Sequence, residues 1–139
     1  MIIADKKKLY LLTVILDLFL LYALITNNLC NKDKIFIFIV LTTHLTFFYS
    51  LYIENKKILD LLHIMLFLLL LFGIFLENIY LLSICLFLLF IIQALWIYEN
   101  RCILNEKEYT FGYGKQLSIS VLLLTIIYSI KIGLTFNNT

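Results

Sequence analysis

The sequence predicts an all-α integral membrane protein, a bundle of five transmembrane helices, and three observations support this prediction. First, 63% of the 139 residues are hydrophobic and 14% are charged, so the chain has more apolar side chains than one small soluble core can bury. Second, the apolar residues fall into runs of about 20, which is the helix length that crosses a hydrocarbon core. Third, short polar segments separate these runs and hold most of the charged residues. Backbone in hydrocarbon must satisfy its own hydrogen bonds, so each run is predicted to be helical.

The chain is interpreted as a single transmembrane domain, residues 1–139. The basic residues Lys6, Lys7 and Lys8 precede the first apolar run. No cleavage site with small residues follows that run, so it is predicted to be a membrane span and not a signal peptide. The apolar run from 58 to 98 is too long for one crossing, and we divide it at Glu77 and Asn78. The predicted spans are 9–26, 35–53, 58–76, 79–98 and 117–136, with a polar loop at 99–116.

The distribution of Lys and Arg predicts the orientation. If the amino terminus is cytoplasmic, the cytoplasmic segments hold eight Lys or Arg residues and the external segments hold Lys32 and Lys34. This excess places the loop at 99–116 in the cytoplasm and the carboxyl terminus outside. Lys131 lies near the outer end of the last span, where its long side chain can reach the interface.

Four ionisable residues within the predicted spans form a candidate intramembrane cluster. His44 and His63 are equidistant from the turn between the second and third spans, so we expect them at one depth. Asp17 falls near that level, and Asp60 lies one turn from His63 on the same helix face. Ionisable groups at membrane depth cost several kcal/mol unless they are paired. Three interpretations remain open: an Asp–His hydrogen bond that joins two helices, a path for protons or ions, and a metal or haem site with two His ligands.

The last span carries small or hydroxyl side chains along one side, which is typical of helix packing in membranes. We expect this stripe to pack within the chain or against a second copy. Gln93, on the fourth span, is predicted to form an interhelical hydrogen bond. The stripe consists of Ser118, Thr125, Ser129 and Gly133.

The polar loop contains two further patterns. The Cys102 thiol lies beside Arg101, which could make it reactive or a palmitoylation site; alternatively it is a small residue packed under the helix ends. Residues 110–114 resemble the Thr-x-Gly-Tyr-Gly filter of potassium channels. However, charged residues precede this segment, and Lys115 stands where those channels carry an acidic residue. We therefore interpret it as a Gly-containing turn that leads into the last helix.

The loop also carries Cys102, Leu104 and Glu108, after an apolar span that contains Trp96. This block resembles a family of small multi-pass membrane proteins of unknown function with the pattern Cys-Pro-Leu-Thr-x-x-Glu, in which Ile103 here replaces the Pro. Similar blocks occur in uncharacterised membrane proteins of large DNA viruses. The resemblance implies a multi-pass membrane protein, which lies in the virion or host membrane if the protein is viral. It implies no activity. The residues of this loop motif are Asn100, Cys102, Glu106 and Glu108.

Together these features predict a structural or accessory membrane protein with a cytoplasmic docking loop. The alternative is a proton or ion conductor built on the intramembrane cluster, and a haem or metal carrier is the third hypothesis. No known catalytic motif is present, so neither an enzyme nor a cofactor is predicted. The expected partners are the lipid bilayer and a membrane protein or second copy. A net charge of +2 does not favour nucleic acid.

Overall fold

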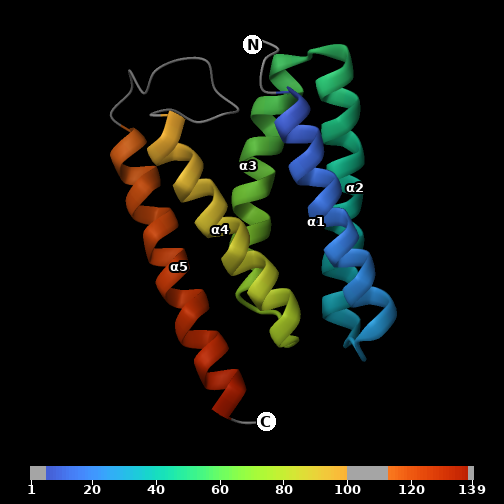
Figure 1. The fold of residues 1–139 in the computed structure, drawn as a ribbon, viewed down its shortest axis with the longest axis vertical. Coiled ribbons are helices and arrows are strands. Elements are labelled where there is room, and N and C mark those ends of the chain that lie inside the picture. Colours follow the sequence, from blue (N-terminus) through green and yellow to red (C-terminus); the bar gives the residue numbers. More distant parts are fainter. Residues whose placement is uncertain (1–5, 100–112, 138–139) are drawn as a thin grey trace.

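The computed structural model describes residues 6–99 and 113–137, which form five α-helices and no strand (Figure 1). The all-α prediction is therefore confirmed. Successive helices run in opposite directions, so the start of α1 and the α2–α3 turn lie at one end of the bundle, the amino-terminal end. The α1–α2 and α3–α4 turns lie at the other, the carboxyl-terminal end. The helices are α1 (Lys6–Thr26), α2 (Asn31–Ile53), α3 (Lys56–Gly73), α4 (Ile79–Glu99) and α5 (Tyr113–Asn137).

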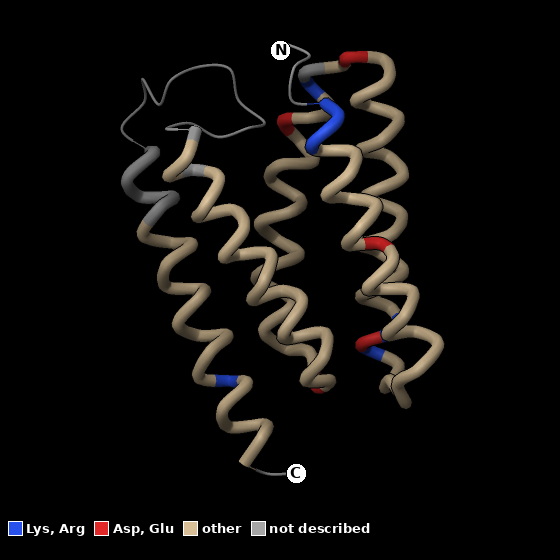
Figure 2. The backbone as a smooth tube through the Cα atoms, viewed as in Figure 1, with Lys and Arg blue, Asp and Glu red and all other residues tan. Residues whose placement is uncertain are grey.

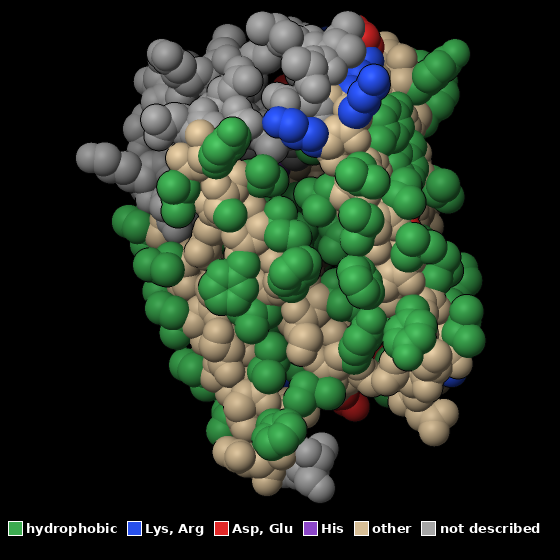
Figure 3. Space-filling view, in the orientation of Figure 1, with side chains coloured by type: hydrophobic (Ala, Val, Ile, Leu, Met, Phe, Trp, Pro, Cys, Tyr) green, Lys and Arg blue, Asp and Glu red, His purple; other side chains and the backbone are tan. Residues whose placement is uncertain are grey.

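Among the described residues, three helical segments are long and apolar enough to cross a membrane. They are α1, α2 and residues 119–137 of α5, and a shorter apolar segment covers Ile79–Leu95 of α4. Hydrophobic side chains cover most of the described face in Figure 3, while basic side chains gather at the amino-terminal end. Both features are typical of a protein whose outer surface contacts lipid.

The helices follow the predicted order, but their ends differ from the predicted spans. α3 ends at Gly73 and not at residue 76, because the N–H groups of residues 74–76 each donate to the carbonyl three residues earlier in a tighter turn. α5 begins at Tyr113, four residues before the predicted span. Lys and Gln are good helix formers, so the helix continues beyond its apolar part.

Asn and Glu residues determine where two of the turns lie. The side-chain oxygen of Asn55 accepts hydrogen bonds from the N–H groups of Lys57 and Ile58 at the start of α3. Asn78 caps α4 in the same way through Tyr80 and Leu81. Glu54 ends α2 in the left-handed conformation, with φ of 55°.

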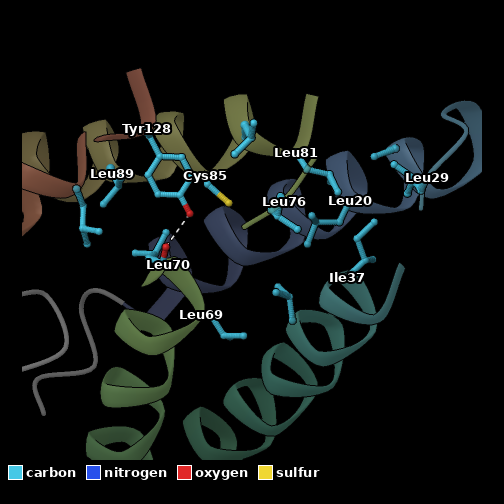
Figure 4. Close-up of a cluster of buried hydrophobic side chains, with 14 of the residues drawn as sticks. Leu20, Leu29, Ile37, Leu69, Leu70, Leu76, Leu81, Cys85, Leu89 and Tyr128 are labelled. Atoms are coloured by element: carbon cyan, nitrogen blue, oxygen red, sulfur yellow. Dashed lines mark hydrogen bonds between the residues drawn. The ribbon is translucent and has the colours of Figure 1, made fainter. Parts of the chain in front are cut away.

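The core lies between all five helices and is built mostly from leucine (Figure 4). α5 packs mainly against α4, and its buried residues recur at helical spacing. Tyr128 is fully buried, and its hydroxyl donates a 2.7 Å hydrogen bond to the carbonyl of Leu70 on α3. This bond connects α5 to the end of α3. The buried face of α5 comprises Val121, Leu124, Thr125 and Tyr128.

Gly73 makes room for the Tyr128 hydroxyl. A Cβ atom at Gly73 would collide with that oxygen, whereas a Cβ at Gly133 would meet nothing within 4 Å. We expect Gly73→Ala to lower the free energy of unfolding by about 1–3 kcal/mol. Thermal unfolding in mild detergent measures the loss. Gly133→Ala is the matched control and should leave stability unchanged or raise it by up to about 1 kcal/mol. Equal effects of the two substitutions would contradict this account of Gly73.

Candidate functional site

Asp17 and His44 form an ionisable pair in the middle of the α1–α2 hairpin. The Nδ1 atom of His44 lies 2.5 Å from Oδ1 of Asp17, and the two side chains are 13% and 20% exposed. The short turn between α1 and α2 makes these helices antiparallel neighbours, which brings residue 17 to the level of residue 44. The hydrogen bond therefore connects the centres of two helices.

His63 contributes to the same region from α3. A cavity of about 170 Å³ lies between α1, α2, α3 and α4, and both His44 and His63 line it. Asp17 is not among its lining residues. Asp60 is exposed and does not line the cavity either. The structure thus joins Asp17 to His44, places His63 on the same cavity, and leaves Asp60 outside it.

The lining of this cavity is almost entirely apolar. Among the described residues, its polar side chains are the two imidazoles and the hydroxyls of Thr13 and Thr43. Each of these hydroxyls donates to a carbonyl of its own helix, at Leu9 and Ile39. A proton path needs successive polar groups within hydrogen-bond reach, so this lining favours a helix-joining pair over a conductor. The described residues also contain no group of three or more metal-ligating side chains.

Asp33 is a buried carboxylate that the sequence analysis did not single out. It lies in the first turn of α2 and is 1% exposed. Its two oxygens accept hydrogen bonds from the N–H groups of Glu77, at 3.2 Å, and Asn78, at 3.1 Å. The side chain therefore attaches the α3–α4 turn to the start of α2. Because its partners are backbone groups distant in sequence, no motif marks this contact.

Polar contacts also attach α5 to its neighbours. Nε2 of Gln93 on α4 donates a 2.7 Å hydrogen bond to Thr125 on α5, which confirms the predicted interhelical contact. Nζ of Lys131 donates to the carbonyl of Ile74, at the end of α3. This is a specific partner near the carboxyl-terminal end of the bundle, where the sequence predicted contact with the interface.

The predicted stripe of small residues coincides only in part with the buried face of α5. Thr125 belongs to that face, and the Ser129 hydroxyl donates to the Thr125 carbonyl within the helix. Gly133 is exposed and has open space around it. The side chain of Ser118 lies outside the described residues. Tyr128, which is larger than any member of the stripe, makes the buried contact with α3.

An ion pair joins α1 to the α2–α3 turn at the amino-terminal end. Nζ of Lys6 lies 2.5 Å from Oε1 of Glu54. The hydrogen bond from Lys6 and its positive charge lower the pKa of Glu54 below the usual 4.5.

The lowered pKa of Glu54 predicts a change of stability in acid. The ion pair contributes its full stabilisation above pH 4.5 and loses it as pH falls through the lower pKa of the folded state. We expect the free energies of unfolding of the wild type and Glu54→Gln, measured as a function of pH, to differ at neutral pH. They should converge as pH falls below the folded-state pKa of Glu54. A difference that persists in strong acid would contradict the assignment.

The loop motif of Asn100, Cys102, Glu106 and Glu108 lies outside the described residues, as do residues 110–112. Tyr113 and Gly114 form the first turn of α5, so the proposed Gly-containing turn is helical in this part. Comparison with known proteins found no matching family model, curated protein or solved structure.

Proposed function

We propose that this chain is an integral membrane protein with five spans that acts as a structural or accessory component of its membrane. Its amino terminus and the loop at 99–116 face the cytoplasm, and the loop is the docking surface for a partner. The observation that supports this proposal most strongly is the division of the bundle into an apolar outer surface and two charged ends.

Apolar side chains are exposed on every helix, including α3 and α4, which are not among the three candidate spans of the described residues. Phe72 on α3 is 64% exposed and Phe87 on α4 is 57% exposed, much like Leu18 and Leu45 on α1 and α2. Water would oppose this exposure on all sides of the bundle, whereas lipid favours it. α3 has 18 residues and would be about 27 Å long at 1.5 Å per residue, close to the hydrocarbon thickness.

Charged residues lie mainly near the two ends of the bundle (Figure 2). Lys7, Lys8 and Lys57 are exposed at the amino-terminal end, where the excess of basic residues predicts a cytoplasmic face. Asp60 is also exposed and lies one turn from the start of α3, where a carboxylate favours the positive end of the helix dipole. It is therefore better explained as an interfacial charge than as part of an intramembrane relay.

The docking role depends on the loop at 99–116, the longest polar segment of the chain. Its Cys-x-Leu-x-x-x-Glu block is also the part that resembles small multi-pass membrane proteins. The two helices that flank this loop, α4 and α5, pack against each other, and binding residues are often carried on loops that a rigid scaffold positions.

Affinity purification from the native membrane in mild detergent tests the docking role. A variant that combines Asn100→Ala, Cys102→Ser and Glu108→Gln is compared with the wild type. The matched control is Lys32→Ala with Glu77→Ala, which removes an exposed ion pair at the opposite end. A partner retained by the wild type and the control but lost from the loop variant supports the proposal. Identical partners for all three proteins would contradict it.

A further inference from the structure

The cavity between α1, α2, α3 and α4 has a shape suited to one slender molecule. Its lining extends from Leu9 to Leu20 along α1 and from Ile84 to Leu95 along α4. Each stretch covers about 16 Å at 1.5 Å per residue. The volume of about 170 Å³ is small for that length. A closed apolar cavity of about 150 Å³ can hold benzene, whereas larger ligands occupy about 300–1,000 Å³. Its accessible volume therefore suits a single ring or chain.

His44 supplies this apolar cavity with one directional polar group. The Nδ1 edge of its ring is engaged by Asp17, which does not line the cavity. Nε2 is the remaining ring nitrogen. The Asp17 carboxyl group also holds the ring in one orientation.

The overall charge of the Asp17–His44 pair determines whether Nε2 of His44 is a hydrogen-bond donor or an acceptor for a ligand. In the apolar surroundings that the proposed membrane location implies, an electrically neutral Asp17–His44 pair is favoured over one with net charge. Neutrality is reached either as carboxylate with imidazolium or as carboxylic acid with imidazole. In both arrangements Nε2 carries a hydrogen atom. His44 therefore presents an N–H donor, which needs an acceptor.

We propose that this cavity binds a slender, neutral, lipophilic carbonyl compound whose oxygen accepts a hydrogen bond from Nε2 of His44. The leucine-rich lining, which includes Leu62 and Leu66, contacts the apolar body of the molecule. A hydrocarbon of the same shape would fit but would leave the N–H group without an acceptor. The site thus selects for a carbonyl group through the hydrogen bond that His44 donates.

Acetophenone and ethylbenzene form a matched pair of probes, because they share size and shape but only acetophenone has a carbonyl oxygen. The full chain is reconstituted in lipid nanodiscs, and retention of each probe is measured against empty nanodiscs. We expect acetophenone to be retained roughly 2- to 10-fold more strongly than ethylbenzene, as one net hydrogen bond implies. The infrared carbonyl band of bound acetophenone should lie at lower frequency than in lipid alone.

Three variants assign the effect to the cavity. Asp17→Leu with His44→Leu should abolish both the preference and the shifted band while ethylbenzene is still retained. Leu66→Phe should reduce retention of both probes by filling the cavity, whereas Ile64→Phe, at an exposed position of α3, should change neither. Equal retention of the probes by the wild type, or a shifted band that persists without His44, would overturn the proposal. Failure to enter nanodiscs would instead contradict the proposed membrane function on which this inference rests.

Discussion

His44→Leu is expected to lower the free energy of unfolding by about 3 kcal/mol, because it leaves the Asp17 carboxyl group without its partner in apolar surroundings. Nδ1 and Oδ1 lie 2.5 Å apart, closer than the 3.2 Å between the Tyr10 hydroxyl and the Phe48 carbonyl of the same two helices. Asp17→Leu should lower the free energy of unfolding by a similar amount, because it leaves the His44 imidazole without its partner. Denaturant titration of the detergent-solubilised protein, followed by circular dichroism, measures both losses.

The double variant Asp17→Leu/His44→Leu separates a pair from two independent side chains. It removes both polar groups and leaves no orphaned charge, so we expect it to be more stable than either single variant. Thr46→Leu, at an exposed site on α2, is the control for added apolar volume and should change stability little. Losses that simply add in the double variant would show that the two residues do not act as a pair.

Asp33→Ala is expected to cost about 2–3 kcal/mol, because two backbone N–H groups then lose a charged acceptor at a buried site. The loss should be local as well as global. Hydrogen exchange should accelerate at the amides of Glu77 and Asn78, since these are the groups that Asp33 protects.

Glu77→Ala is the matched control for Asp33→Ala. It removes the exposed ion pair with Lys32 but retains the backbone groups that bind Asp33. An exposed pair of this kind contributes under about 1 kcal/mol. If Asp33→Ala were no more destabilising than Glu77→Ala, or left amide exchange unchanged, the anchoring role of Asp33 would be wrong.

Sequence patterns predicted the helices better than their ends. An apolar run predicts a helix because lipid or the protein core must cover its side chains. A reversal at Asn78 is consistent with the preference of Asn for the N-cap position of a helix. The early end of α3 follows from the tighter turn at residues 74–76, and Gly73 leaves room there for a tyrosine on another helix. A single sequence does not show such a contact before the packing of α5 is known.

The sequence predicted the depth of the candidate-site residues along the bundle, but not the direction in which their side chains point. Equal distance from a turn predicts that His44 and His63 share a level, yet it does not say where each ring points. The structure adds that Nδ1 of His44 meets Asp17 and that both imidazoles line one cavity. Asp33 resembled an ordinary charge between Lys32 and Lys34, because backbone partners far along the chain leave no mark in the sequence.

Labelling of the three natural cysteines with a membrane-impermeant maleimide tests the proposed topology most directly. Variants that each retain one cysteine are prepared in sealed vesicles of known orientation. Cys30 immediately precedes α2 at the carboxyl-terminal end and Cys85 is buried, while Cys102 belongs to the loop. The proposed topology predicts that Cys30 reacts from the exterior, that Cys102 reacts only from the cytoplasmic face, and that Cys85 reacts from neither. Labelling of Cys102 from the exterior, or of Cys30 and Cys102 from the same face, would contradict it.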